Sequence, residues 1–121
     1  MRVPIIAGNW KMNKTSEEAV ALCDNLLRRL KEVNDREVVL CPPFTALTVV
    51  GEALRGTKIA LGAQNVFYEK SGAYTGEISP IMLKALGVEY VIIGHSERRQ
   101  HFGETDEMVN LKAKAAILND L

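Results

Sequence analysis

Four short apolar runs, each followed by a helix-like pattern, constrain the fold of this chain more than any other feature. The runs are Ile5-Ile6-Ala7, Val38–Cys41, Ile59-Ala60-Leu61 and Tyr90–Ile93. They are rich in β-branched residues and continuous rather than alternating, as is typical of strands buried on both faces of a parallel sheet. Strand followed by helix, four times over, predicts a parallel α/β protein with right-handed crossovers.

The segments between these runs carry signals for the start of a helix. Thr15 and Glu18 have the spacing of a capping box, and an amphipathic pattern follows them. A second helix is expected from about Thr45 to Leu54, and Ser79-Pro80 opens a third. Thr105, followed by two acidic residues, opens a fourth.

Composition excludes several classes of protein. The chain has 121 residues, enough for a single domain over residues 1–121, and its 47% hydrophobic content is that of a globular protein. Fifteen basic and fifteen acidic residues leave no net charge, which argues against nucleic-acid and anionic-membrane partners. No apolar stretch approaches the roughly 18 residues of a membrane span, and no secretory signal is visible, so a soluble cytoplasmic protein is expected.

The metal-binding and redox residues are few. Cys23 and Cys41 are too few for a disulfide framework and are expected to be reduced thiols. His95 and His101 stand six residues apart and do not share a helix face, which argues against a two-histidine metal site. Nucleotide-binding, serine-hydrolase and zinc-peptidase motifs are absent from the sequence.

The order of the elements fits two architectures, an open sheet of the flavodoxin type and a part of a closed barrel. The periodicity of the sequence does not choose between them. Both architectures place ligand sites at the carboxyl ends of parallel strands. Functional side chains are therefore expected directly after the four apolar runs.

Polar side chains follow the first run. Lys11 is placed where an ammonium can attract a phosphate or a developing oxyanion, although a lone lysine more often extends into water. Asn9 requires hydrogen-bond partners in the layer above the strand. Cys41, at the end of the second run, has no histidine beside it, which argues against a thiol nucleophile.

A long segment without helical period precedes Ser79. Loops of about fifteen residues in compact domains are usually functional or disordered. Tyr74 and Thr75, between Gly72 and Gly76, predict a shaped protrusion that could enter a partner's pocket. The alternative is a flexible excursion, which the aromatic content disfavours.

The stretch YVIIGHSERR, Tyr90 to Arg99, ends the fourth run with a histidine. If a short helix begins near Ser96, the His95 ring lies at its positive end, which disfavours the imidazolium form. A neutral imidazole can donate a hydrogen bond to a carbonyl oxygen and move protons during enolisation. Judged alone, His95 would be assigned a structural role, but Lys11 and Asn9 at another strand end favour the functional interpretation.

Five motifs in register resemble the triosephosphate isomerase family. They are AGNWKMN (7–13), CPPFTAL (41–47), GAQNV (62–66), GAYTGEIS (72–79) and VIIGHSERR (91–99). Their order and spacing are those of the family, and the resemblance runs from Arg2 to the last residue. It implies an α/β fold that is half of a (β/α)8 TIM barrel, four parallel β/α units, in an enzyme that interconverts dihydroxyacetone phosphate and glyceraldehyde 3-phosphate without a cofactor.

The resemblance also implies roles for single residues. Asn9 and Lys11 would bind the substrate, with Lys11 supplying positive charge to the phosphate and the enediolate. His95 would be the neutral electrophile that polarises the carbonyl, a role for which this family is the standard example, and Glu97 the acid that pairs near Lys11. The resemblance implies a homodimer whose interface includes Gln64, Asn65, Thr75 and Arg98, with the loop around Thr75 packed beside the neighbour's Asn9 and His95.

A complete barrel of this type needs about 250 residues, so residues 1–121 would be its amino-terminal half. In the family, the glutamate base follows strand six and the phosphate loops follow strands seven and eight, which would lie beyond Leu121. General base catalysis typically contributes about 10²–10⁴-fold to a rate. Residues 1–121 alone are therefore expected to have negligible isomerase activity.

Two alternatives remain open. One is a non-catalytic half-barrel module that associates with itself, because four strands cut from a barrel would leave the edges of the first and fourth strands unpaired. The other is a different phosphosugar-binding barrel enzyme that uses Lys11 and His95.

Overall fold

The computed structural model describes all residues, 1–121. Its strands are β1 (Ile5–Asn9), β2 (Glu37–Cys41), β3 (Ala60–Ala63) and β4 (Tyr90–Val91). Its helices are α1 (Ser16–Arg29), a 3₁₀ turn (Phe44–Ala46), α2 (Leu47–Leu54), α3 (Pro80–Ala85), α4 (Ser96–Phe102) and α5 (Asp106–Leu118). The predicted alternation of strands and helices is confirmed, with the short α4 lying between β4 and the predicted fourth helix, α5.

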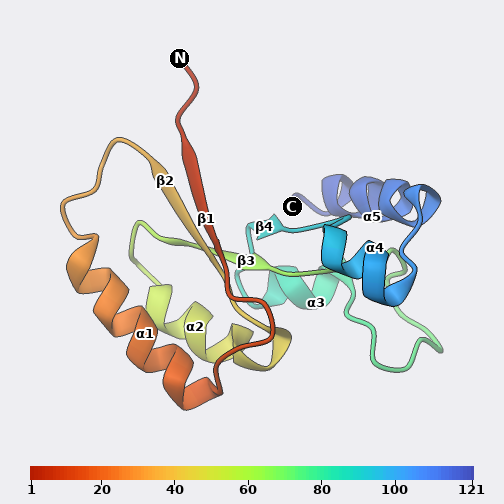
Figure 1. Ribbon diagram of the computed structural model, residues 1–121, viewed down its shortest axis with the longest axis horizontal. Helices are drawn as coiled ribbons and strands as arrows, with labels where there is room; N and C mark the ends of the chain where they lie inside the picture. The colour runs from red at the N-terminus through yellow and green to blue at the C-terminus, as the bar shows by residue number, and fades with distance from the viewer.

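The four strands form one parallel sheet in the order β1-β2-β3-β4. An open sheet of the flavodoxin type would instead place the first strand between the second and the third. Strands added in one direction only, as Figure 1 shows, are the arrangement of a barrel wall. The structure therefore decides for half of a (β/α)8 barrel, as the motifs predicted.

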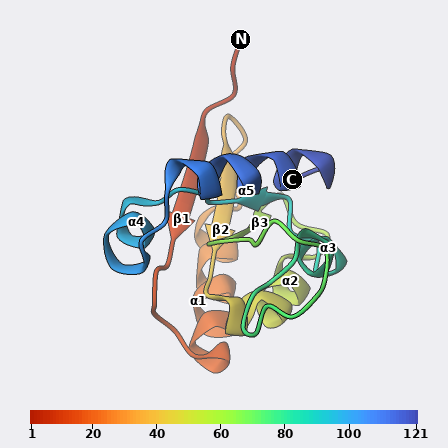
Figure 2. The same cartoon turned by 90° about the vertical axis from the view of Figure 1, so that its right-hand side faces the viewer.

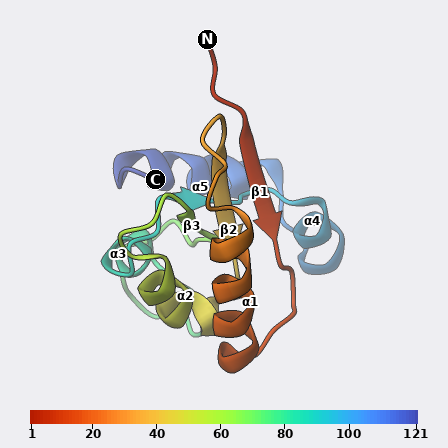
Figure 3. The ribbon, with the colours of Figure 1, turned by 90° about the vertical axis from the view of Figure 1, so that its left-hand side faces the viewer.

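The sheet is covered differently on its two faces. Figure 3 shows α1 lying along β1 and β2, and Figure 1 shows α2 and α3 on the same side of the sheet. The core on this face joins buried sheet residues such as Leu40 and Leu61 to helix residues such as Cys23, Val50 and Leu83. A smaller cluster on the other face contains Val39, Cys41 and Ala60, with Tyr90 and Ile92 packed against it. Apolar residues on both faces explain why the strand sequences do not alternate.

The predicted caps are present. Thr15 Oγ1 accepts the Glu18 amide at 3.3 Å, and Glu18 Oε1 accepts the Thr15 amide at 3.1 Å, which completes the capping box of α1. Ser79 Oγ accepts the Met82 amide at 3.2 Å at the start of α3. Gly87 follows α3 with φ +82°, a left-handed conformation that suits glycine after a helix.

Two boundaries differ from the prediction. The strand expected over Tyr90–Ile93 is shorter, because only Tyr90 and Val91 pair as strand residues, although the Ile92 amide still donates to the Ala63 carbonyl at 2.9 Å. Gly94 then turns the chain towards α4 with φ +65°. The second helix begins with a 3₁₀ turn at Phe44, directly after Pro43, one residue before the expected start.

Both outer strands have a free edge. β1 and β4 each pair with one neighbour only, and Ile5 and Ile6 on β1 are about half exposed, at 53% and 52%. The amino terminus extends beyond β1, away from the helices (Figure 2). None of the helices is both long enough and apolar enough to cross a membrane.

Gly62 on β3 marks a close approach between two strands. A Cβ at this position would lie 2.5 Å from Cys41 Sγ and 3.0 Å from Val39 Cγ1. We expect Gly62→Ala to lower the free energy of unfolding by about 1–3 kcal/mol, because overpacking displaces these side chains. Denaturant unfolding measures this, with Gly8→Ala on β1 as the matched control, because there the nearest atoms lie at 3.6 Å. Equal stability of the two variants would contradict the packing described for β2 and β3.

Candidate active site

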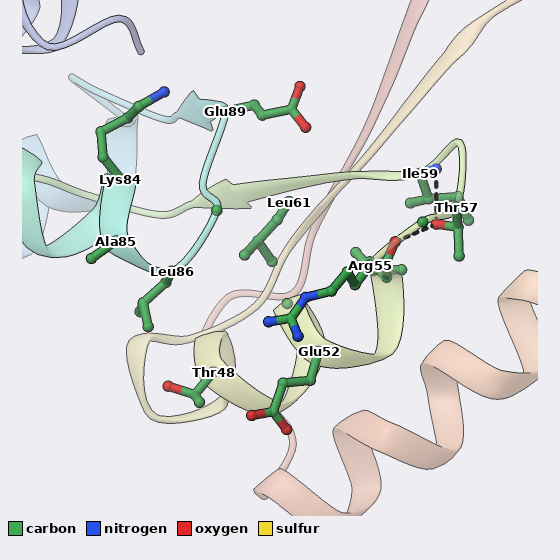
Figure 4. Close-up of a pocket in the computed structure, with 14 residues that line it drawn as sticks. Thr48, Glu52, Arg55, Thr57, Ile59, Leu61, Lys84, Ala85, Leu86 and Glu89 are labelled. Atoms are coloured by element: carbon green, nitrogen blue, oxygen red, sulfur yellow. Dashed lines mark hydrogen bonds between the residues drawn. The ribbon is translucent and has the colours of Figure 1, made fainter.

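Two cavities lie at opposite ends of the strands. The larger, about 560 Å³, is bordered by the ends of α2 and α3, and Figure 4 shows Arg55, Lys84 and Glu89 around it. The smaller, about 350 Å³, lies at the carboxyl ends of the strands. It is lined by seven of the eight predicted site residues, all except Thr75: Asn9, Lys11, Gln64, Asn65, His95, Glu97 and Arg98. Because barrel enzymes carry their active sites at the carboxyl ends of strands, the smaller cavity is the candidate active site.

Lys11 has an unusual backbone conformation. Its φ is +56°, in the left-handed region that residues other than glycine seldom occupy. The Lys11 amide donates to Asn9 Oδ1 at 3.0 Å, and Gln64 Nε2 donates to the Lys11 carbonyl at 2.9 Å. These two bonds hold the conformation, and the first supplies the partner that the Asn9 amide was expected to need. Backbone strain that neighbours hold in place is characteristic of functional sites.

The Lys11 side chain crosses from the end of β1 to α4. Lys11 Nζ lies 2.6 Å from Glu97 Oε1 on the first turn of α4. The hydrogen bond from Lys11 holds the pKa of the Glu97 carboxyl below its usual value of 4.5. Both side chains are about half exposed, so the pair contributes little to stability. Its effect is to hold the ammonium group at the cavity that His95 also lines.

His95 is the N-cap residue of α4, so a short helix does begin at Ser96, the condition on which the interpretation of His95 depended. Its Nδ1 accepts the Glu97 amide at 3.1 Å. Glu97 Oε2 lies 3.7 Å from the same nitrogen, too far for a hydrogen bond. With Nδ1 as an acceptor, the ring proton is assigned to Nε2, which leaves Nε2 as a donor on a side chain that lines the cavity.

Gln64 and Asn65, which the resemblance assigned to a subunit interface, make contacts within the chain. Gln64 Nε2 donates to both the Lys11 and the Cys41 carbonyls at 2.9 Å, and so connects the ends of β1 and β2. Asn65 Oδ1 accepts from Lys112 Nζ at 2.9 Å. Thr75 is exposed and does not line the cavity, although its neighbour Gly76 does.

A buried ion network beside the cavity was not predicted from the sequence. Glu104 Oε2 accepts from Arg98 Nε at 2.8 Å and from Lys112 Nζ at 2.9 Å, and the Glu104 and Lys112 side chains are only 1% and 3% exposed. Burial opposes ionisation of Glu104, but the hydrogen bonds from Lys112 and Arg98 outweigh it and hold the pKa of the carboxyl below 4.5. One sequence signal was available. Lys112 stands three and four residues before Ala115 and Ala116, so on a helix it shares the face of these apolar residues, which is the buried face of α5.

The two thiols are buried in the core. Burial raises the pKa of each, Cys23 and Cys41, to about 11. At pH 8 we expect the native protein to react with an aromatic disulfide reagent about 100-fold more slowly than the denatured protein, in which both thiols react. Native thiols that react at the denatured rate would contradict this burial and reopen a role for Cys41.

The structure contains no group of three or more histidine, cysteine or acidic side chains that could hold a metal ion. The cavity instead presents an ammonium group, a ring N–H and amide groups. These donors can bind an anion and stabilise negative charge that develops on an oxygen.

Four consecutive parallel β/α units with these groups at their carboxyl ends define part of a (β/α)-barrel enzyme. Residues 4–121 match the protein family described as triosephosphate isomerase. The chain belongs to the triosephosphate isomerase family, an isomerase family.

The similarity to individual relatives covers essentially the whole chain. The chain is 61% identical over 121 residues to triosephosphate isomerase from Caldanaerobacter subterraneus subsp. tengcongensis and 57% identical to that from Roseiflexus castenholzii. The crystal structure of triosephosphate isomerase from Bartonella henselae matches with a TM-score of 0.92 and 41% identity over 99% of this chain. The chain spans about half the length of these relatives, 48% of the two sequences and 49% of the crystallised chain.

Proposed function

We propose that residues 1–121 are the amino-terminal half of a TIM-barrel domain and supply the Asn9, Lys11 and His95 part of a triosephosphate isomerase active site. The reaction interconverts dihydroxyacetone phosphate and glyceraldehyde 3-phosphate by proton transfer through an enediolate. The observation that carries this proposal is that Lys11 from the end of β1 and His95 from the end of β4 line one cavity. Family membership supports the same reaction.

Each of these groups has a task that follows from its chemistry. The Lys11 ammonium group attracts the phosphate and stabilises the negative charge of the enediolate, and Asn9 supports it by holding the Lys11 amide. The His95 ring donates from Nε2 to the carbonyl oxygen of the substrate and moves a proton between the two oxygens of the enediolate. Glu97 fixes both groups, since its carboxylate binds Lys11 and its amide binds His95 Nδ1.

The carbon acid also requires a base, and Glu97 is poorly suited to that task. Its carboxylate is bound to Lys11, and the same bond keeps it a weak base. The base and the phosphate loops are supplied by a second half-barrel like the one that completes the relatives. A polypeptide of residues 1–121 alone therefore has negligible isomerase activity.

The loop around Thr75 forms the contact with a second copy in the complete enzyme. Tyr74 is 44% exposed and its ring lies 4.7 Å from that of Phe67, so the loop is exposed and supported from within. Gln64, Asn65 and Arg98 would belong to the same interface, since all three line the cavity that the partner's loop would reach. The protein acts in the cytoplasm, where its substrates are metabolised.

The test uses a chimera of residues 1–121 joined to the remaining half of the Caldanaerobacter relative. Incubated with dihydroxyacetone phosphate in deuterium oxide, the chimera should form glyceraldehyde 3-phosphate that carries deuterium on the carbon beside the aldehyde. A proton that a base abstracts can exchange with solvent before it is returned through the enediolate, whereas a hydride shift would bring no deuterium into the product. No product above the protein-free blank, or product entirely without deuterium, would refute the proposal.

A second candidate function, a self-associating half-barrel module, is favoured by the exposed Ile5 and Ile6 on the free edge of β1. If this is the function, purified residues 1–121 form a defined dimer of twice 13.4 kDa by light scattering, and Ile6→Lys dissociates it. A stable monomer would exclude the module. Thr75→Lys is the matched control, since the module does not use the Thr75 loop.

A further inference from the structure

Both backbone polar groups of the residue before His95 are held by charged side chains. The Gly94 amide donates to Glu104 Oε1 at 3.3 Å, and the Gly94 carbonyl accepts from Arg99 Nε at 3.3 Å. Gly94 has φ +65°, and a Cβ there would lie 3.0 Å from Val109 Cγ1. These contacts fix the backbone conformation of Gly94 and therefore the orientation of the backbone at His95, and Glu104 supplies one of them.

The other oxygen of Glu104 connects this turn to the far side of the cavity. Glu104 Oε2 accepts from Lys112 Nζ, and the same Nζ donates to Asn65 Oδ1. The residue before Asn65, Gln64, holds the carbonyl of Lys11. A continuous chain of hydrogen bonds thus connects the His95 turn, through Glu104 and Lys112, to Asn65. The peptide bond between Asn65 and Gln64 continues it to Lys11, whose carbonyl Gln64 binds.

We propose that Glu104 and Lys112 are positioning residues for the reaction, a buried brace that fixes the orientation of His95 relative to Lys11. This proposal deepens the proposed isomerase function and rests on it. A brace of this kind must be buried, since a solvent-exposed ion pair is too mobile to fix a neighbouring backbone amide. It also needs a carboxylate, because the group receives donors on both of its oxygens.

Glu104→Gln tests this requirement. The amide that replaces the carboxylate has one acceptor oxygen, whereas donors approach from two sides, Gly94 on one and Arg98 with Lys112 on the other. The oxygen turns to the two cations, and the NH₂ group then opposes the Gly94 amide. The His95 turn is displaced, although the volume of the side chain is unchanged.

The first readout is the tautomer of His95 in residues 1–121. The protein has two histidines, so ¹⁵N-histidine labelling with His101→Gln as background gives a single ring to follow. Protonated and unprotonated ring nitrogens give separate ¹⁵N signals, and we expect one Nε2–H tautomer in the parent protein. In Glu104→Gln the two signals should move towards each other, because the bond from the Glu97 amide to Nδ1 is weakened.

The second readout is kinetic and uses the chimera. A shift of about 1 Å at a catalytic group can cost on the order of 10²-fold in rate. We therefore expect Glu104→Gln to lower kcat by about 10- to 100-fold while KM changes less than about threefold, as for a group that acts in the transition state. Glu107→Gln is the matched control. Glu107 lies exposed on the first turn of α5, so its substitution makes the same chemical change outside the Glu104 network.

The double variant Glu104→Gln/Lys112→Met separates positioning from bulk stability. Without the lysine, only Arg98 competes with the Gly94 amide for the amide oxygen, so part of the parent tautomer signal should be regained relative to Glu104→Gln, whereas kcat stays low because the link from Lys112 to Asn65 is lost. If the role were only structural, the substitutions would change the stability of the protein, while the ¹⁵N signals of the folded protein would stay as in the parent. The double variant also removes the unbalanced buried cation that could unfold the single variant.

The proposal is overturned if Glu104→Gln matches Glu107→Gln in both the ¹⁵N signals and kcat, or if the double variant moves the ¹⁵N signals further from those of the parent than Glu104→Gln does. Failure of the isomerase function gives a different result. In that case the parent chimera forms no product, while the His95 tautomer still responds to Glu104→Gln.

Discussion

Replacing His95 by glutamine in the chimera is expected to lower kcat by about 10²–10⁴-fold, the range that general acid–base catalysis typically contributes. Glutamine can still donate a hydrogen bond to the substrate oxygen, but it cannot carry a proton between the two oxygens of the enediolate. KM should change little, because the lost interaction develops mainly in the transition state. A coupled assay over a range of substrate concentrations separates the two constants.

His101→Gln is the control for this prediction. His101 is the other histidine of the chain and lies exposed on α4, six residues after His95, so it carries the same change on the same helix. It should leave kcat unchanged within about twofold, as is usual for a surface substitution without a partner. A His95→Gln chimera as active as His101→Gln would remove His95 from the reaction.

Lys11→Met is expected to lower kcat/KM by about 10²–10³-fold, as for the loss of one group that stabilises a developing oxyanion. Here KM should rise as well, since the ammonium group attracts the phosphate of the substrate before the reaction begins. Lys14→Met is a close control, because Lys14 is exposed in the same loop and also has a positive φ, +80°. Equal losses of kcat/KM from the two substitutions would show that any change in this loop lowers activity and that the Lys11 charge is not specifically required.

The same substitution has a consequence for Glu97. The bond from Lys11 is the main cause of its lowered pKa, so Lys11→Met should move the pKa of Glu97 up towards 4.5. A lowered carboxyl pKa means that the Lys11–Glu97 interaction is fully present above the ordinary pKa and is lost as the pH falls through the folded value. Carboxyl ¹³C NMR titration of the parent and Lys11→Met proteins measures this. An unchanged Glu97 titration would contradict the 2.6 Å contact.

Local sequence signals predicted most of the fold. The capping box at Thr15 and the N-cap at Ser79 depend on residues within one helical turn, and both are present. The strand ending at Ile93 was predicted too long, because its apolar side chains remain packed against the core after the backbone has left the sheet. Apolar side chains report burial, and burial alone does not fix strand pairing.

The site was predictable only in part. The place of Lys11 and His95 after buried strands identified them as candidates, since a parallel sheet brings strand ends together. The positive φ of Lys11 and the partners of Glu104 depend on residues far away in the sequence. Such contacts leave no periodic pattern, and the bond from Arg98 to Glu104 was accordingly not predicted.

One measurement tests the central claim most directly: the rate of dihydroxyacetone phosphate isomerisation by three polypeptides in the same coupled assay. These are residues 1–121, the remaining half of the Caldanaerobacter relative, and the chimera that joins them. We predict no rate above the blank for either half and a rate for the chimera that His95→Gln lowers by about 10²–10⁴-fold. A rate from residues 1–121 alone that disappears with His95→Gln would contradict the account, because these residues would then carry a complete active site.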